Sequence, residues 1–138
     1  MIDFVFTTRR EKVGLAPMSK VLIVEDAPFI REMIRDILES HDHEIAGEAA
    51  NGLEAIEKFK ALKPDVVLMD ILMPGMDGLS AIMKIIEIDP RAKIIVVSAL
   101  VKEALRKEAM RAGAVDFVAK PFQVERLLEA VRAATTAS

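Results

Sequence analysis

Five short apolar segments, separated by longer amphipathic ones, constrain the fold more than any other feature of the sequence. The segments are KVLIV (20–24), HEIAGEA (43–49), DVVLM (65–69), KIIVV (93–97) and AVDFVA (114–119). Most are apolar throughout, which is typical of strands covered on both faces and therefore of a parallel sheet between helical layers. The second segment contains His43, Glu44 and Glu48, and this polarity predicts an edge strand.

The segments between these strands have helical periodicity, with apolar residues spaced three or four apart. Representative positions of the five stripes are Ile30, Ile34 and Leu38; Ala55 and Phe59; Leu79, Ile82 and Ile86; Leu105 and Ala109; Val124, Leu128 and Val131. Pro28 and Asn51-Gly52 suit helix starts, and Gly113 suits a helix end. The sequence therefore predicts a single α/β domain of five βα units with right-handed crossovers.

The bulk composition supports a domain of this kind and excludes several classes of function. A chain of 138 residues with 52% hydrophobic content can build one core. The net charge of −3 gives no basic surface for nucleic acid, and the absence of cysteine excludes disulfides and thiolate metal sites. No apolar segment has the length of a membrane span, and the N-terminus lacks the pattern of a signal peptide, so we expect a cytoplasmic protein.

The chain divides into three parts at the level of sequence. Residues 1–18 have mixed charge and no clear period, and we interpret them as an extension, an upstream start or a vector-derived remnant. Residues 19–134 form the predicted domain, and residues 135–138 are expected to be a C-terminal tail.

Polar residues fall at the carboxyl ends of four of the five predicted strands. Glu25 and Asp26 follow the first strand, Asp70 the third, Ser98 the fourth and Lys120 the fifth. In an open parallel sheet, ligands bind at this edge, near the point where the strand order reverses. Three converging carboxylates repel one another unless a cation lies among them, and Mg²⁺ prefers oxygen ligands of this type.

This set of residue types matches the chemistry of phosphoryl transfer. Asp70 would be the nucleophile and the product an aspartyl phosphate. Lys120 supplies a positive charge and Ser98 a hydroxyl donor for the transferring oxygens.

Individually, each residue also has an ordinary structural explanation. Glu25 and Asp26 would suit the N-terminus of a helix. Asp70 and Ser98 could each cap a turn, and Lys120 could be a solvated surface lysine. The joint placement favours a site, because independent capping residues have no reason to gather at one edge of a sheet.

Three further polar residues receive structural explanations only. Asp77, which precedes Gly78, is expected to cap a turn or a helix. His41 and His43 flank the second strand and are expected to be solvated, because no third metal ligand is evident nearby.

Four segments together form a signature that is specific to one family. In order, they are VLIVED, MDILMPGMDG, IIVVSA and DFVAKPF. Through them, the chain from Met18 to about Ala134 resembles the response-regulator receiver family of two-component signalling, and within it the single-domain chemotaxis regulators. The resemblance implies a flavodoxin-like fold, a doubly wound parallel sheet with strand order 2-1-3-4-5.

The resemblance also implies chemical roles at the strand ends. Asp70 matches the phosphoacceptor and Lys120 the lysine that binds the phosphate, while Ser98 and Phe117 match two switch residues. The Lys120-Pro121 bond is expected to be cis. Such a domain is a signalling module with self-catalysed phosphoryl transfer and dephosphorylation, not an enzyme acting on a separate substrate.

A Mg²⁺ site is implied by the same resemblance. Asp26 matches a direct ligand and Glu25 an acid that acts mainly through water, and the backbone carbonyl of Ile71 matches another metal contact. Glu25 stands where the family more commonly has Asp, so its longer side chain could alter the metal geometry.

Two apolar residues close to the site bear on the lifetime of the phosphoryl group. Leu72 and Leu100 lie two residues after Asp70 and Ser98, at positions that in the family influence how water is placed. Because apolar side chains hold water poorly, we predict slow self-dephosphorylation. Phe117 stands where Tyr is frequent, so no hydroxyl can report the switch.

The resemblance implies protein partners, with neither nucleic acid nor membrane, and a monomeric state. A histidine kinase would supply the phosphoryl group. A motor switch or adaptor protein would bind the face formed by the helix around Leu105, the strand at 114–119 and the last helix. A phosphorelay intermediate, which passes phosphate to a histidine phosphotransfer protein, is the alternative within the family.

Other classes of protein are less compatible with the residues present. An aspartate-nucleophile phosphohydrolase typically has a second Asp two residues after the nucleophile, where this chain has Leu72. A cofactor-binding flavodoxin-like module needs a phosphate-binding loop after the first strand, where EDAPFI instead supplies acids. GTPase chemistry is excluded because the chain lacks a G-x-x-x-x-G-K-[ST] motif.

Overall fold

The computed structural model describes residues 19–73 and 75–136 of the chain. The proposed extension at residues 1–18 lies outside these ranges. Strands and helices alternate in the order β1 (Lys20–Val24), α2 (Pro28–Glu39), β2 (Glu44–Ala49), α3 (Gly52–Leu62), β3 (Val66–Met69), α4 (Gly78–Ile88), β4 (Ile94–Ser98), α5 (Glu103–Ala112), β5 (Asp116–Ala119) and α6 (Val124–Thr136). The last helix continues through Thr136, so residues 135 and 136 are helical.

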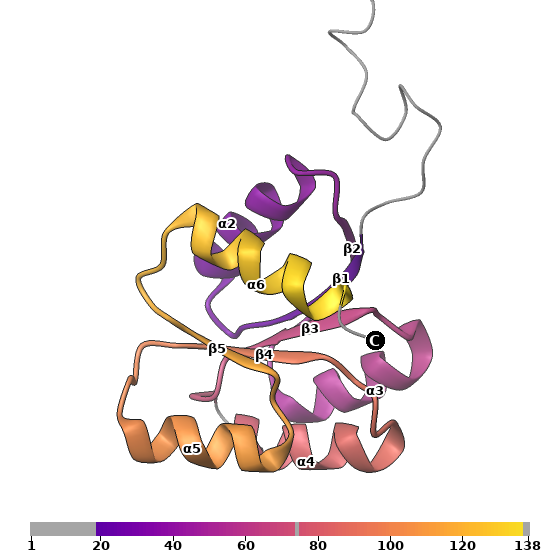
Figure 1. The fold of residues 1–138 in the computed structure, drawn as a ribbon. Helices are drawn as coiled ribbons and strands as arrows, with labels where there is room; N and C mark the ends of the chain where they lie inside the picture. The colour runs from indigo at the N-terminus through magenta and orange to yellow at the C-terminus, as the bar shows by residue number, and fades with distance from the viewer. Residues whose placement is uncertain (1–18, 74, 137–138) are drawn as a thin grey trace, which may run out of the picture.

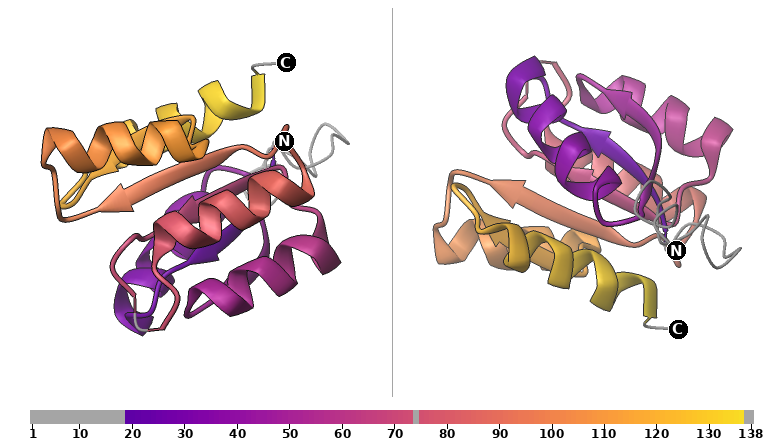
Figure 2. Two further views of the ribbon diagram at one scale, coloured as in Figure 1. Left: turned by 90° about the horizontal axis from the view of Figure 1, so that it is seen from below. Right: turned by 90° about the horizontal axis from the view of Figure 1, so that it is seen from above.

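The five strands form one parallel sheet in the order β2-β1-β3-β4-β5, which confirms the predicted topology. Helices α2 and α6 cover one face of the sheet, and α3, α4 and α5 cover the other (Figure 1). Seen from below, these three helices lie in front of the strands (Figure 2). The polar second segment is the edge strand β2, as its sequence predicts.

The core consists of two clusters, one on each face of the sheet. Along β1, Val21 and Ile23 pack into the cluster under α2 and α6, while Leu22 and Val24 pack into the cluster under α3, α4 and α5. Alternate side chains of a strand point to opposite faces, so an apolar strand supplies both clusters. The central strand β3 is likewise buried at every position.

The predicted helix boundaries are also found. Pro28 begins α2, and the Asn51 side chain caps α3 by accepting a hydrogen bond from the Glu54 backbone N–H. Gly113 ends α5 with a φ of 125°, a conformation that side chains rarely allow. Among the described residues, none of the helices combines the length and apolar character needed to cross a membrane.

Candidate functional site

The strand-end residues are held in place by backbone hydrogen bonds to neighbouring strands. The backbone N–H of Glu25 donates to Ala49 at the end of β2 (2.9 Å), and that of Asp70 donates to Val24 at the end of β1 (3.0 Å). The Lys120 N–H donates to the Ser98 carbonyl (2.8 Å). These bonds extend the parallel ladders by one residue and bring the predicted site residues to the same edge of the sheet.

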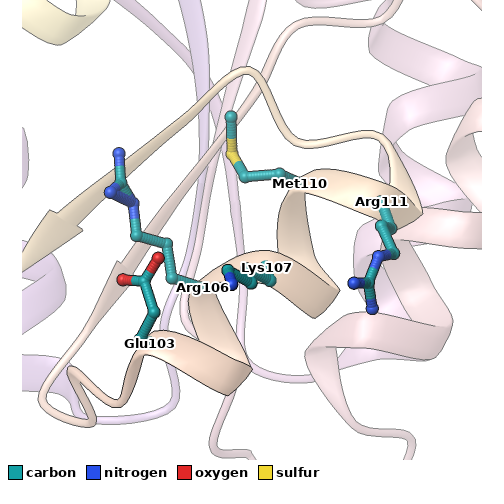
Figure 3. A pocket seen from close by; sticks show the side chains of 5 residues that line it. All are labelled: Glu103, Arg106, Lys107, Met110 and Arg111. Atoms are coloured by element: carbon teal, nitrogen blue, oxygen red, sulfur yellow. The ribbon is translucent and has the colours of Figure 1, made fainter.

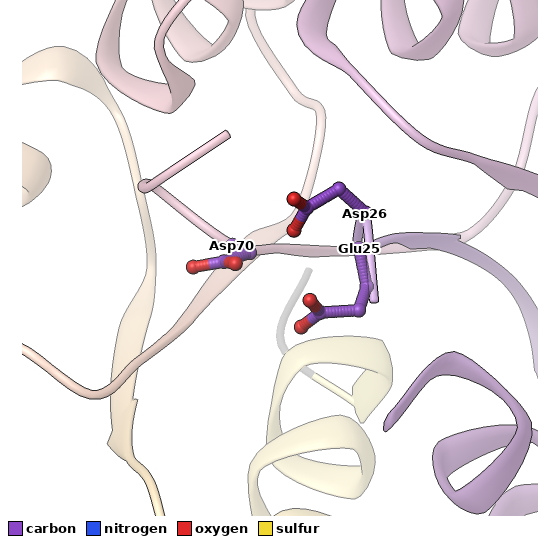
Figure 4. A group of neighbouring side chains, drawn as sticks. All are labelled: Glu25, Asp26 and Asp70. Carbon is purple, nitrogen blue, oxygen red and sulfur yellow. The ribbon is translucent and has the colours of Figure 1, made fainter. Parts of the chain in front are cut away.

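Three carboxylates gather at this edge, as the sequence predicts. Glu25, Asp26 and Asp70 each offer an oxygen atom, and these three atoms lie within 4.8 Å of one another. Figure 4 shows Glu25 and Asp26 projecting from the end of β1 and Asp70 from the end of β3. Glu25 and Asp70 are buried, whereas Asp26 is exposed, so the acid cluster (Glu25, Asp26 and Asp70) opens to solvent on the Asp26 side.

Lys120 supplies the positive charge of the site. Its Nζ is 2.6 Å from Glu25 Oε1 and 3.6 Å from Asp70 Oδ2, and its side chain is 18% exposed. The alternative explanation of Lys120 as a solvated surface lysine is therefore wrong. The lysine partly neutralises two of the three acids, and Asp26 has no ion pair among those found in the described residues.

The environment of Asp70 makes its ionised form less favourable than that of a solvated aspartate. Burial is the largest effect and raises the pKa of the Asp70 carboxyl above its ordinary value. Lys120 opposes this rise, and the negative charges of Glu25 and Asp26 add to it. A nearby cation would stabilise this carboxylate, because added positive charge favours its ionised form.

Three of the site side chains are oriented by the backbone N–H two residues later. Glu25 Oε2 accepts from Ala27 (3.1 Å), Asp70 Oδ1 from Leu72 (3.2 Å) and Ser98 Oγ from Leu100 (3.1 Å). For Asp70 and Ser98, these are the turn hydrogen bonds that their ordinary explanation predicts. The cap of α2 is Ala27, which makes no side-chain cap bond, so Glu25 does not cap that helix. The turn and the site are therefore compatible, because each turn bond fixes the direction of a side chain at the sheet edge.

The two predicted switch residues are both buried. Ser98 is fully buried, and its hydroxyl accepts the Leu100 bond. Phe117, on β5, is 8% exposed and belongs to the core cluster under α3, α4 and α5. Its ring therefore already lies inward in this structure.

The loop after β3 packs tightly against the end of that strand. Gly78 donates its N–H to the carbonyl of Ile71 (3.0 Å), and a Cβ at this glycine would lie 2.6 Å from Ile71 Cα and 2.7 Å from the Asp70 carbonyl oxygen. The Ile71 carbonyl accepts this one bond and has a second lone pair, so its contact with a cation stays a prediction. Gly75 has a φ of 81° and open space around it.

Two other local predictions can be compared with the structure. Asp77 caps α4 by accepting from the Ser80 N–H, as predicted. The Lys120-Pro121 bond is cis, which is also as predicted.

The prediction that His43 is solvated is wrong. His41 is exposed, but His43 is only 5% exposed, and its Nδ1 lies 2.7 Å from the Ser19 hydroxyl. The turn before β2 folds back on the start of β1, where the Glu44 N–H donates to the Ser19 carbonyl, and this closure buries the ring. Burial lowers the pKa of His43, as do the charges of His41 and Arg132, against a smaller opposite effect of Asp42.

Arg31 and Glu48, which join the site to the edge strand, are not among the site residues that the sequence predicts. Arg31 on α2 donates to the Glu25 carbonyl and to the Glu48 carboxylate on β2. The predicted strand order could have indicated this contact. It places the end of β2 beside the end of β1, and both strand ends lie under the first turns of α2.

The donor set of the acid cluster fits a hard divalent cation such as Mg²⁺. Three carboxylates supply the oxygen atoms that Mg²⁺ prefers, and such an ion is commonly bound by one or two carboxylates together with water and phosphate. The exposed side at Asp26 leaves room for those additional ligands.

Comparison with known proteins gives the same result along most of the chain. The family model described as the response regulator receiver domain matches residues 21–132. The chemotaxis protein CheY of Thermotoga maritima is 56% identical over 112 residues, which cover 81% of this chain and 93% of the relative. CheY of Bacillus subtilis is 49% identical with the same coverage.

Solved structures with the same fold also come from this group. The response regulator domain of Thermotoga maritima CheB has a TM-score of 0.81 and 40% identity, covering 86% of this chain and 97% of that one. CheY in a CheX-CheY-BeF3-Mg complex from Borrelia burgdorferi has a TM-score of 0.80 and 38% identity, covering 83% and 87%.

Proposed function

The chain belongs to the response-regulator receiver family, and from this premise we propose that Asp70 accepts a phosphoryl group from a histidine kinase in the presence of Mg²⁺. The phosphorylated protein then signals by binding an output protein in a chemotaxis or motility pathway of the cytoplasm. Relatives named CheY match this chain over nearly their full length, which supports a single-domain regulator. We propose that this regulator acts as a monomer.

One observation carries the proposal. The Asp70 carboxylate lies at the end of β3 among two further acids and faces Lys120 at 3.6 Å. A nucleophilic carboxylate, acids suited to a metal and a cation for the transferred oxygens are the parts that phosphoryl transfer requires.

The residues divide the chemistry between them. One oxygen of Asp70 forms a bond to phosphorus as the bond from phosphorus to the donor nitrogen breaks, and the donor imidazole leaves with that electron pair. Lys120 exchanges its contact with Glu25 for a contact with the phosphoryl oxygens. The Leu72 N–H holds Asp70 Oδ1, which limits rotation of the carboxylate during attack.

Glu25, Asp26 and Asp70 would hold the Mg²⁺. When bound, the cation offsets the negative charge of the acids and of the phosphoryl oxygens. Asp26, the exposed member of the acid cluster, is well placed to be a direct ligand, while Glu25 is already engaged by Lys120 and by the Ala27 N–H.

Phosphorylation would be transmitted through Ser98 and Phe117 to a face made of α5, β5 and α6. The Ser98 hydroxyl would leave the Leu100 N–H to donate to a phosphoryl oxygen. The inward position of Phe117 would then be favoured over an outward one, which is a shift between two populations.

The α5 part of this face is predominantly basic. A shallow hollow of about 310 Å³ lies on this helix (Figure 3). Its lining residues are Glu103, Arg106, Lys107, Met110 and Arg111. Three cations around one acid favour an output protein that presents acidic residues.

The first experiment tests the phosphoacceptor. Wild-type protein incubated with Mg²⁺ and a small phosphodonor such as acetyl phosphate is expected to gain one phosphate by intact-mass spectrometry. Asp70→Asn is expected to gain none, whereas Asp65→Asn, an acid at the other end of β3, is expected to gain one. Equal phosphorylation of the wild type and Asp70→Asn would contradict the assignment.

A second experiment tests the output. The protein is used to capture partners from a lysate of source cells, with and without Mg²⁺ and beryllofluoride, a mimic of the bound phosphoryl group. Capture of a motor-switch or adaptor protein only with the mimic supports a motility regulator. Capture of a histidine phosphotransfer protein that the mimic does not strengthen would instead indicate a phosphorelay intermediate.

A further inference from the structure

Arg31 links the backbone of the acid cluster to the edge strand. On the second turn of α2, its Nη1 donates to the carbonyl oxygen of Glu25 at 2.6 Å, and its Nε donates to Glu48 Oε1 at 2.8 Å. The Arg31 side chain is 21% exposed, so both bonds form in a partly buried environment. Charge-assisted hydrogen bonds of this kind are stronger than bonds between neutral groups.

The turn between β1 and α2 is held by hydrogen bonds on both sides of Asp26, at Glu25 and at Ala27. The Glu25 N–H donates to Ala49, the Glu25 carbonyl accepts from Arg31, and the Ala27 carbonyl accepts from the Arg31 backbone N–H at 3.0 Å. Arg31 therefore holds this turn through both its side chain and its backbone. Asp26 lies between the two tied residues, and its direction is set by the turn.

Glu48 holds the guanidinium in line with the Glu25 carbonyl. It also accepts from Arg35, one helical turn further along α2. Although burial acts in the opposite direction, the hydrogen bonds from Arg35 and Arg31 hold the pKa of Glu48 below its ordinary value.

We propose that Arg31 is a positioning residue for divalent-cation binding: by donating to the Glu25 carbonyl, it fixes the turn that points Glu25 and Asp26 toward Asp70. This inference rests on the proposed function, because it concerns the same acid cluster. Arg31 does not touch the reacting atoms. Its effect falls on the affinity for the cation and leaves the transfer step unchanged once the cation is bound.

The chain provides a matched control for this proposal. Arg35 lies on the same helix and bonds to the same carboxylate, but it donates to Glu48 and Glu39 and not to the Glu25 carbonyl. Arg31→Met and Arg35→Met therefore each lose one charge and one bond to Glu48. Only Arg31→Met loses the bond to the turn.

The experiment measures Mg²⁺ binding by isothermal titration calorimetry, and the phosphorylation rate as a function of Mg²⁺ with acetyl phosphate as donor. Arg31→Met is expected to raise the Mg²⁺ dissociation constant about tenfold, the lower end of the range for residues that orient metal ligands. The rate at saturating Mg²⁺ is expected to match that of the wild type. Arg35→Met is expected to leave both quantities unchanged.

The other outcomes overturn the proposal. Equal dissociation constants for Arg31→Met and Arg35→Met would place the effect in the pairing with Glu48, and a slower rate at saturating Mg²⁺ would place it in the transfer step. If Arg31→Met does not fold, Arg31→Lys decides, because a lysine keeps the positive charge beside Glu48 but lacks the two diverging N–H groups that bond Glu48 and the Glu25 carbonyl together; an unchanged dissociation constant then rejects the proposal. Wild-type protein that binds no Mg²⁺ would reject the proposed function itself.

Discussion

Lys120 lies nearer to Glu25 than to Asp70, with 2.6 Å from its Nζ to Glu25 Oε1 and 3.6 Å to Asp70 Oδ2. The closer contact is possible because Glu25 has one methylene more than an aspartate. In the proposed reaction, this lysine must move from Glu25 to the phosphoryl group. The ion pair with Glu25 thus holds Lys120 away from the place where it would contact the phosphoryl oxygens.

Shortening this acid is expected to release the lysine. A partly buried ion pair of this kind contributes about 1 kcal/mol, so Glu25→Asp is expected to speed phosphorylation by acetyl phosphate about fivefold at saturating Mg²⁺. Glu87→Asp, on the exposed face of α4, is the control and is expected to have no effect. An unchanged or slower rate for Glu25→Asp would show that the Glu25 pair does not restrain Lys120.

The apolar residues beside the site are expected to protect the phosphoryl group. Leu72 is 53% exposed and Leu100 is 38% exposed, and their backbone N–H groups bond to Asp70 and Ser98. Leu72→Asn, which can orient a water, is expected to speed loss of phosphate by about tenfold. The rate is measured on purified phosphoprotein without a phosphatase, with Ile88→Asn on α4 as the control. Rapid loss from the wild type would refute the expectation of a slow intrinsic rate.

Removal of the Asp70 charge is expected to stabilise the metal-free protein. Burial, with the charges of Glu25 and Asp26, raises the pKa of Asp70, so its ionisation favours the unfolded chain. The folded state is therefore favoured most when Asp70 is protonated, below its unfolded pKa, and this advantage is lost as the pH rises through the folded pKa.

At pH 7 without Mg²⁺, Asp70→Asn is expected to unfold at higher urea, with a gain of about 1 kcal/mol. Near pH 3.5 the difference is expected to shrink. Added Mg²⁺ is expected to stabilise the wild type more than the variant, because a ligand stabilises the state that binds it. A variant less stable than the wild type at pH 7 would mean that the Asp70 charge is already well compensated by Lys120.

The buried histidine is expected to make the protein sensitive to mild acid. Burial lowers the pKa of His43, so between its folded pKa and its unfolded value near 6.5 the unfolded chain binds more protons. The contribution of neutral His43 to the free energy of unfolding is fully present above that unfolded pKa. It falls as the pH drops toward the folded pKa, by at most about 1.4 kcal/mol per pH unit.

Urea unfolding at pH 7.5 and pH 5.5 measures this effect. His43→Gln is expected to lose much of the difference between the two pH values, whereas His41→Gln, at an exposed position, is expected to retain it. Equal pH dependence in the wild type and His43→Gln would assign the effect to other groups.

The sequence predicts the fold well because the fold depends on local periodicity. Apolar runs such as 65–69 and 93–97 are too short for helices and too continuous for half-exposed strands, which leaves the centre of a parallel sheet. The acid cluster could be predicted for a related reason. In a parallel sheet, the ends of neighbouring strands lie at one edge, so the positions of Glu25, Asp26 and Asp70 along the chain imply their proximity.

Contacts between the sheet edge and side chains on a helix could not be predicted in the same way. The bonds from Arg31 to Glu25 and Glu48 depend on the rotation of α2 about its axis and on the reach of a long side chain. The burial of His43 depends on how closely one turn folds back on Ser19. The periodicity of the sequence predicts neither the Arg31 bonds nor the burial of His43, because a polar residue next to an edge strand can face either solvent or another polar side chain.

The two glycines of the loop after β3 limit amino-acid exchange for different reasons. Gly75 is restricted by its own backbone angle, so a residue such as asparagine that tolerates positive φ can replace it at modest cost. Gly78 is restricted by its neighbours, since even a methyl group there would have to displace the backbone of Asp70 and Ile71. A related chain that retains every acid and the lysine but lacks this glycine would keep the proposed reactive groups while misplacing the proposed phosphoacceptor. Inspection of the acids and the lysine alone would count such a chain as a working receiver.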